Sequence, residues 1–184
     1  MKAIATRIPD VLIIEPQIFP DARGYFCETY HQGKFAALGI RCPFVQDNES
    51  LSQRGVLRGL HFQRAPHAQA KIVRVLEGEI LDVALDLRRG SPTFGMHAAV
   101  RLSQDNRRML YLPEGLAHGF AVLSSTARIA YKCSALYAPD SEDAVDALDP
   151  ALGIDWGAPA ESFLRSPKDL RARSWESYAA NPLF

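Results

Sequence analysis

The chain has 184 residues, of which 47% are hydrophobic and 23% charged, and its 21 basic and 21 acidic side chains give a formal net charge of zero. This apolar content excludes a disordered chain, and charges or turn residues interrupt every apolar run before the roughly 20 residues that a membrane-spanning helix needs. The balanced charge creates no overall field for nucleic acid or an anionic membrane, so we expect neither as a partner. The length fits one domain, residues 1–184.

Short β-rich runs separated by turn signals dominate the sequence. In chain order, the predicted strands are 11–14, 25–30, 44–46, 56–63, 71–76, 80–87, 97–102, 109–112, 119–123 and 128–136. Two short helices are predicted: one at 31–38, closed by Gly39, and one that begins at Ser166 with Pro167 in its first position. Many short, regularly spaced strands predict an all-β sandwich or barrel.

One predicted strand has a clear alternation. In the run 81–87 every odd position is aliphatic, whereas Asp82 and Asp86 occupy two of the even positions. One face of this strand is therefore expected to pack against a core. The other face meets either solvent or a polar cavity, and the strand alone does not decide between them.

The cysteines and the N-terminus bear on the cellular compartment. Cys27, Cys42 and Cys133 are odd in number and widely spaced, which argues against a disulfide framework and against a zinc knuckle. The first ten residues contain no apolar core of a signal peptide. We therefore expect a cytoplasmic location, on the absence of a signal alone.

Several classes of chemistry lack their motifs. The sequence has no glycine-rich phosphate loop, no dinucleotide fingerprint and no serine-hydrolase elbow. Its five histidines form no H-x-H or H-E-x-x-H pair, so we expect no metal. Residues 50–76 contain five basic side chains and no acidic one, which fits either a local anion site or a solvated face; they are Arg54, Arg58, Arg64, Lys71 and Arg74.

Several segments combine titratable residues with glycine or proline. They are 19–26 (FPDARGYF), 44–48 (FVQDN), 55–63 (GVLRGLHFQ), 69–73 (QAKIV), 91–95 (SPTFG), 113–120 (PEGLAHGF), 131–132 (YK) and 166–169 (SPKD). In this order, over about residues 10–169, the chain resembles the deoxysugar-nucleotide 3,5-epimerases typified by dTDP-4-dehydrorhamnose 3,5-epimerase. The resemblance implies a cupin-type jelly roll, a homodimer, and no metal or organic cofactor. It also implies the substrate dTDP-4-keto-6-deoxy-D-glucose, inverted at C3 and C5 to give dTDP-4-keto-L-rhamnose.

Inversion beside a ketone passes through an enolate, so it needs a base on one face of the sugar, an acid on the other and a positive group at the oxygen. The resemblance assigns these roles to four residues. His61 matches the general base, and Asp169 matches the carboxylate that orients it and stabilises the imidazolium. Tyr131 matches the acid, and Lys71 matches the group at the carbonyl oxygen.

The resemblance also implies substrate contacts. Arg23 and Arg58 match phosphate contacts, for which a guanidinium fork is well suited. Tyr137 matches an aromatic that influences which carbons are processed. The matched contacts are Arg23, Phe26, Glu28, Gln46, Asn48, Arg58, His118, Tyr137 and Lys168, some of which come from the partner subunit in the family. Asp82 is expected to support the site from behind, and for Asp82 and His118 a plain structural role stays open.

The geometry of the predicted strand 56–63 raises a difficulty. Strict alternation places Arg58 and His61 on opposite faces, although the site needs both on one face. Gly59 lies between them, and it predicts a bulge or twist that re-aims one of the two side chains.

Other functions remain open at this point. Related members of the same family could invert one carbon only, or act on another nucleotide-linked sugar. A ketoisomerase would use similar enolate chemistry, and a non-catalytic barrel would bind a sugar nucleotide without turnover. A dimer is expected because an edge strand such as the N-terminal run can extend a partner's sheet.

Overall fold

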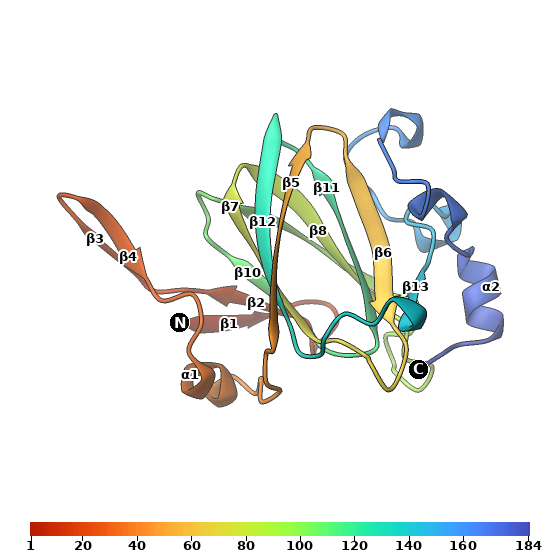
Figure 1. Ribbon diagram of the computed structural model, residues 1–184, viewed down its shortest axis with the longest axis horizontal. Coiled ribbons are helices and arrows are strands. Elements are labelled where there is room, and N and C mark those ends of the chain that lie inside the picture. Colours follow the sequence, from red (N-terminus) through yellow and green to blue (C-terminus); the bar gives the residue numbers. More distant parts are fainter.

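Antiparallel strands make up most of the structure, a computed structural model that describes all 184 residues (Figure 1). One sheet has six strands, in the order β1 (Lys2–Ala5), β2 (Leu12–Glu15), β10 (Met109–Leu112), β7 (Lys71–Glu77), β12 (Thr126–Cys133) and β5 (Gln46–Gln53). The other has five, in the order β13 (Glu142–Ala144), β6 (Leu57–Gln63), β11 (Leu116–Val122), β8 (Glu79–Asp86) and β9 (His97–Ser103). The predicted all-β class is confirmed.

Helices are short and lie outside the sheets. The two α-helices are α1 (Gln32–Ala37) and α2 (Trp175–Ala180), and the 3-10 turns are η1 (Pro139–Ser141), η2 (Pro150–Leu152), η3 (Ala160–Ser162) and η4 (Asp169–Arg171). No helix has the length and apolar character needed to cross a membrane. The predicted helix at 31–38 corresponds to α1, whose first turn is capped by the His31 side chain, which accepts from the Lys34 amide.

The two sheets enclose the main core between them. It contains 16 buried side chains from both sheets, among them Val73 of β7, Ile80 of β8 and Phe120 of β11. A second core of 13 residues lies on the other side of the five-stranded sheet, where the C-terminal segment contributes Trp156 and Tyr178. Burial of these apolar side chains on both faces gives the five-stranded sheet its position as the middle layer.

The alternation in 81–87 now has an explanation. Leu81, Val83 and Leu85 pack in the core beneath the C-terminal segment. The even positions face the interior between the sheets, where Asp82 is fully buried. The second face of β8 is therefore buried between the sheets, where Asp82 lies on the same face as the core residues Ile80 and Ala84, and it does not meet solvent.

Some predicted element boundaries were wrong. The run beginning at Ser166 does not form an α-helix: it makes one 3-10 turn, η4, after the Ser166 hydroxyl has bonded to Asp169. Of the predicted strand 44–46, only Gln46 lies in a strand, β5, whose eight residues Gln46–Gln53 carry polar side chains on both faces. Periodicity of apolar residues cannot reveal such a strand.

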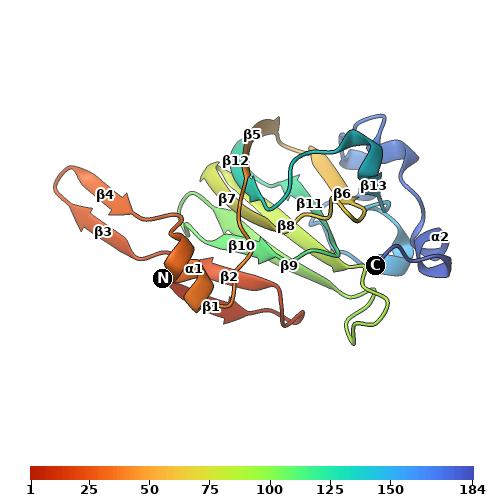
Figure 2. The ribbon, with the colours of Figure 1, turned by 60° about the horizontal axis from the view of Figure 1, so that its bottom comes forward.

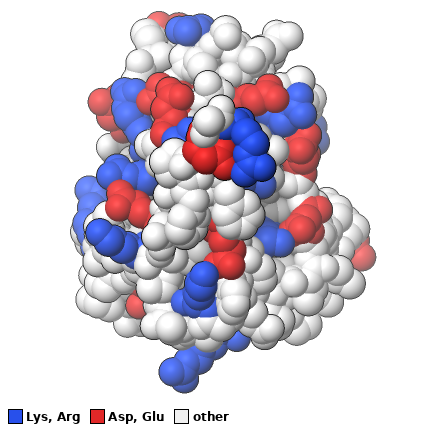
Figure 3. All heavy atoms as spheres, turned by 90° about the vertical axis from the view of Figure 1, so that its left-hand side faces the viewer, with Lys and Arg blue, Asp and Glu red and all other residues white.

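A hairpin of β3 (Ile18–Asp21) and β4 (Gly24–Cys27) projects from the body of the molecule (Figures 1 and 2). It forms a separate two-stranded sheet. Its aromatic side chains Phe19, Tyr25 and Phe26 are exposed, with relative accessibilities of 50%, 55% and 68%. Viewed from the side on which the hairpin projects, acidic and basic side chains intermingle around uncharged areas, and neither sign forms a continuous patch (Figure 3).

Candidate active site

A cavity of about 240 Å³ opens where the edges of the two sheets approach each other. Strands β5, β7 and β12 of the six-stranded sheet supply part of its wall, and β6 and β13 of the five-stranded sheet supply the opposite part (Figure 1). Its lining residues are Gln46, Asn48, His61, Phe62, Gln63, Gln69, Lys71, Tyr131, Cys133, Tyr137 and Glu142. Titratable groups from distant parts of the sequence therefore meet at one place.

His61 and Asp169 form a short contact beside this cavity. The Nε2 atom of His61 lies 2.5 Å from Oδ1 of Asp169, although the two residues are 108 positions apart. The His61 side chain is 27% exposed and the Asp169 side chain only 2%. Since an ionised carboxylate only accepts, Nε2 carries the proton of this hydrogen bond, and Nδ1 of His61 has no protein partner.

Further donors hold Asp169 in its ionised form. Its Oδ2 accepts from the hydroxyl of Ser166 at 2.7 Å and from the Ser166 amide at 3.3 Å. The amide of Gly59 donates to Oδ1. Burial alone would raise the pKa of Asp169, but the hydrogen bonds from His61 and Ser166 outweigh it and lower the pKa to about 2.

A register shift in β6 resolves the predicted conflict between Arg58 and His61. His61 lies opposite His118 of β11, and Arg58 lies opposite Phe120, so β6 has one residue more than β11 between these pairs. Because residues opposite each other share a face, the bulge turns Arg58 and His61 to the same side. The predicted irregularity at Gly59 is present.

Glycine is required on both strands at this bulge. Gly59 has φ of +122°, and a Cβ atom there would come within 2.5 Å of the Gly119 Cα. A Cβ on Gly119 would lie 2.6 Å from the carbonyl oxygen of Arg58. The close approach of the β6 and β11 backbones at the bulge, which turns His61 to the face of Arg58, thus depends on Gly59 and Gly119.

Tyr131 and Lys71 reach the cavity from the six-stranded sheet. Tyr131 packs against the main core, and burial raises the pKa of its phenol. Lys71 begins β7, and desolvation by the surrounding protein lowers the pKa of its ammonium group. Burial therefore keeps the Tyr131 phenol protonated, and it removes the solvent that would otherwise screen the charge of Lys71 from a nearby oxygen.

The mouth of the cavity has its own polar network. The Tyr137 hydroxyl donates to Oε2 of Glu142 at 2.6 Å, and Lys168 forms an ion pair with the same carboxylate. Burial would raise the pKa of Glu142, but Lys168 and Tyr137 lower it overall. Nε2 of Gln46 donates to Oδ1 of Asn48 at 2.9 Å, next to Tyr131 on the neighbouring strand.

Three further predicted residues, Arg58, His118 and Asp82, do not line the cavity. Arg58 is exposed, and its Nε donates to the Ser52 hydroxyl of β5, which links the two sheets. His118 and Asp82 form a second pair, with 2.7 Å between Nε2 and Oδ1, inside the protein. Since neither His118 nor Asp82 lines the cavity, a role of this pair in supporting the site stays a prediction.

Three predicted contacts are not brought to the cavity of this single chain. Arg23, in the turn of the projecting hairpin, is paired with Asp21 and its side chain is 90% exposed. Phe26 is exposed on β4, and Glu28 is paired with Lys34 at the base of the hairpin. None of these three residues lines the cavity.

Five cavity-lining residues were missed by the prediction from sequence, among them Phe62, which also belongs to the second core. Gln63 follows His61 by two positions and so shares its face of β6, which alternation could have shown once the histidine was assigned. Glu142, Gln69 and Cys133 had no comparable signal. Glu142 follows an ordinary turn, and Cys133 in the sequence is indistinguishable from a packing residue.

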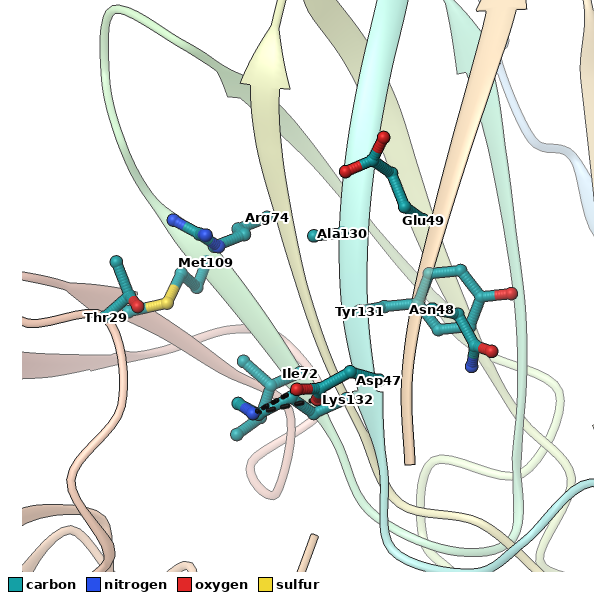
Figure 4. A pocket seen from close by; sticks show the side chains of 10 residues that line it. All are labelled: Thr29, Asp47, Asn48, Glu49, Ile72, Arg74, Met109, Ala130, Tyr131 and Lys132. Atoms are coloured by element: carbon teal, nitrogen blue, oxygen red, sulfur yellow. Dashed lines mark hydrogen bonds and ion pairs between the residues drawn. The ribbon is translucent and has the colours of Figure 1, made fainter. Parts of the chain in front are cut away.

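A larger groove of about 390 Å³ lies on the outer face of the six-stranded sheet (Figure 4). It contains an ion pair between Lys132 and Asp47 at 2.8 Å, but no histidine. In Figure 4 the side chains of Tyr131 and Asn48 point away from Lys132 and Asp47, as alternation along β12 and β5 requires. We place the candidate active site in the smaller cavity because it is lined by His61, the hydrogen-bond partner of Asp169, together with Tyr131.

Two antiparallel sheets that enclose a polar cavity place the chain among the cupin-type jelly rolls. The family model described as dTDP-4-dehydrorhamnose 3,5-epimerase matches residues 5–177. The dTDP-4-dehydrorhamnose 3,5-epimerase of Methanothermobacter thermautotrophicus is 47% identical over 184 residues, covering 100% of this chain and 97% of that protein. The chain belongs to the dTDP-4-dehydrorhamnose 3,5-epimerase family of carbohydrate epimerases, which confirms the resemblance seen in its sequence.

Solved structures agree with this assignment. The crystal structure of dTDP-6-deoxy-D-glucose-3,5-epimerase from Legionella pneumophila, in complex with dTDP-4-keto-L-rhamnose, is 47% identical, with a TM-score of 0.93, and the match covers 100% of this chain and 98% of that one. A 3'-monoepimerase from Streptomyces bikiniensis, in complex with dTDP-quinovose, is 37% identical, with a TM-score of 0.89, and the match covers 96% and 89%. The same fold is thus found with two outcomes of epimerisation.

Proposed function

We propose that this protein inverts C3 and C5 of dTDP-4-keto-6-deoxy-D-glucose to give dTDP-4-keto-L-rhamnose, a step of dTDP-rhamnose biosynthesis. The observation that carries the proposal is the arrangement of the cavity: His61, hydrogen-bonded to Asp169, lines it from the five-stranded sheet, and Tyr131 lines it from the six-stranded sheet. Family membership and the ligand of the Legionella pneumophila enzyme support the choice of substrate.

His61 is the proposed base. Its Nε2–H is bound to the Asp169 carboxylate, so the lone pair of Nδ1 is free to accept a proton. A C–H bond next to the ketone breaks, the proton moves to Nδ1, and the electron pair enters the carbonyl group to form an enolate. Asp169, ionised because its pKa is about 2, stabilises the imidazolium that results.

Lys71 and Tyr131 complete the inversion. The Lys71 ammonium stabilises the negative charge that develops on the enolate oxygen. Tyr131 then donates its phenolic proton to the same carbon from the opposite face. Its raised pKa keeps the proton on the phenol until a strongly basic carbon is present. The imidazolium then loses a proton to solvent and the phenolate regains one, which restores both side chains. Only protons are transferred, so the cycle has no net redox change.

The nucleotide end is proposed to bind at the open side of the cavity. Arg58 shares a face with His61 and supplies a guanidinium group for the diphosphate. Arg23, Phe26 and Glu28 are proposed to come from the projecting hairpin of a partner subunit in a homodimer. The exposed aromatic side chains of this hairpin support the proposal, because a docked hairpin would cover them.

Solvent exchange tests the proposed reaction. The protein is incubated in D₂O with dTDP-4-keto-6-deoxy-D-glucose, and the sugar is analysed by mass spectrometry and NMR. We expect deuterium at both C3 and C5, with inversion at both carbons. Label at one carbon would instead identify a monoepimerase, the activity named for the similar protein from Streptomyces bikiniensis. A shifted carbonyl would identify a ketoisomerase, and binding without exchange would identify a non-catalytic barrel.

Subunit complementation tests the proposed homodimer. Arg23→Ala and His61→Ala are each expected to be inactive as homodimers. If the hairpin of one subunit completes the site of the other, mixed dimers contain one intact site and regain activity after unfolding and refolding together. A mixture that stays inactive, although light scattering shows dimers, would contradict a shared site.

A further inference from the structure

An irregular segment, residues 134–138, connects β12 to η1 and forms part of the mouth of the cavity. It follows β12, which carries Tyr131, and it holds Tyr137, which lines the cavity. The segment belongs to neither sheet, so its backbone groups need partners from elsewhere. Side-chain amides supply them.

Glutamines bind the backbone of successive residues in this segment. Nε2 of Gln69 donates to the carbonyl of Ala135 at 2.8 Å. Oε1 of Gln46 accepts from the amide of Tyr137 at 2.8 Å. These two bonds hold the segment on either side of Leu136, one from the β6–β7 connection and one from the start of β5.

Gln63 makes the most extensive contact. Its Oε1 accepts from the Ala138 amide at 2.8 Å, and its Nε2 donates to the Leu136 carbonyl at 3.2 Å and to the His67 carbonyl at 2.7 Å. The residue is only 4% exposed. Because both ends of the amide are used, a carboxylate or an apolar side chain of similar size cannot replace it.

The position of Gln63 connects these glutamine hydrogen bonds to the proposed base, His61. Gln63 lies two residues after His61, on the same face of β6, so the strand that carries the base also fixes the segment that carries Tyr137. The Tyr137 ring is held at its other end by Glu142, which accepts from its hydroxyl. Tyr137 is therefore held both at its backbone amide and at its hydroxyl, and these two contacts fix the position of its ring relative to His61.

We propose that Gln63, with Gln69 in support, is a positioning residue that fixes Tyr137 as the wall of the sugar cavity and thereby determines whether both carbons are inverted before release. The inference rests on the proposed function. C3 and C5 of one ring must reach His61 in turn, so the sugar has to shift within the cavity between the two steps without leaving it. A loose wall lets the singly inverted sugar depart between the two steps.

The test is Gln63→Glu. It keeps the shape of the side chain but replaces the Nε2 donor by an oxygen that faces the carbonyl oxygens of Leu136 and His67. Gln32→Glu, an exposed residue on α1, is the matched control for the added charge. In D₂O, turnover at both carbons is expected to slow. The ratio of doubly to singly inverted sugar should fall about tenfold, because roughly three hydrogen bonds are lost or weakened. The control should retain the wild-type ratio.

A Gln63→Glu protein that turns over more slowly but keeps the wild-type ratio would overturn the inference, because a purely structural role predicts that result. If this variant does not fold, Gln69→Ala removes a single bond and should shift the ratio in the same direction by about threefold; an unchanged ratio there also overturns it. Absence of any label with the wild-type protein would instead reject the proposed function itself.

Discussion

Two histidine–aspartate pairs involve histidines on neighbouring strands of the five-stranded sheet, His61 on β6 and His118 on β11, and they differ in access and in support. His61 lines the cavity, its side chain is 27% exposed, and it lies 2.5 Å from Asp169 of η4. His118 and Asp82 are 2.7 Å apart, but the histidine side chain is only 9% exposed and the carboxylate is fully buried. The same chemical pair thus occurs once at a cavity and once behind it.

Their hydrogen-bond networks differ as well. Both oxygens of Asp169 accept bonds, from His61, Gly59 and Ser166. Oδ2 of Asp82 is buried and has no hydrogen-bond partner. We therefore expect a His–Asp pair to act as a base only where the free nitrogen of the histidine can reach substrate and further donors hold the carboxylate ionised.

Replacing the accessible histidine should have the largest effect. His61→Gln retains a side chain that can bond to Asp169 but removes the proton acceptor. We expect kcat to fall by about 10²- to 10⁴-fold, the usual contribution of a general base. Steady-state epimerisation measures this effect, with circular dichroism as a check on folding. A loss of less than about tenfold would contradict the assignment of His61.

Asp169→Asn should have the next largest effect. The amide cannot stabilise the imidazolium, and its NH₂ group can donate to Nε2, which favours the wrong tautomer of His61. We expect kcat/KM to fall about 100-fold. If Asp169→Asn keeps near wild-type kcat/KM while His61→Gln is inactive, the carboxylate does not act through the histidine.

His118→Asn tests the buried pair. Since this histidine does not line the cavity, we expect a change in kcat of less than about tenfold together with a loss of about 1–3 kcal/mol in the free energy of unfolding, because Asp82 keeps its burial but loses its partner. Urea denaturation and steady-state kinetics separate the two quantities. A kinetic defect as large as that of His61→Gln would place His118 in the chemistry.

The pH dependence of stability extends the comparison to a third buried carboxylate, Asp86. Burial would raise its pKa, but bonds from Arg88, Ser91 and Thr93 lower it to about 2, as for Asp169. Because both pKa values lie below the ordinary 3.8, their stabilisation is present above about pH 4 and is lost as the pH falls toward 2.

The expected size of this effect is about 2 kcal/mol for each group, from 1.4 kcal/mol per pKa unit. Denaturant unfolding between pH 6 and 2 measures it. Asp86→Asn should flatten the acid limb of the profile while leaving activity at neutral pH intact, whereas Asp169→Asn should flatten the limb and also reduce activity. An acid limb that neither variant changes would contradict the assignment of these carboxylates.

The strands that alternate or form long apolar runs could be predicted from the sequence. The runs 56–63, 71–76 and 80–87 correspond closely to β6, β7 and β8. β5 was not predicted over its length because its inner face, which borders the cavity, carries Gln46 and Asn48 in place of apolar residues. The function of this strand is therefore the reason that its periodicity is weak.

Contacts between distant segments limited what could be predicted of the site. Family resemblance assigned His61 and Asp169, but periodicity could not bring together residues 108 positions apart. Gly59 did indicate the bulge, because its position between Arg58 and His61 conflicted with simple alternation. Glu142 was missed because it reaches the cavity only in the folded chain, whereas Gln63 could have been found from its alternation with His61 along β6. The roles of all site residues, and the cytoplasmic location, stay predictions.

The most direct test of opposed proton transfer is the fate of deuterium in Tyr131→Phe beside His61→Gln. With the phenol removed and the base kept, the substrate should take up deuterium from D₂O at C3 and C5 without inversion, since the same face is deprotonated and reprotonated. With the base removed, no label should enter. Normal inversion by Tyr131→Phe, or continued exchange by His61→Gln, would contradict the account.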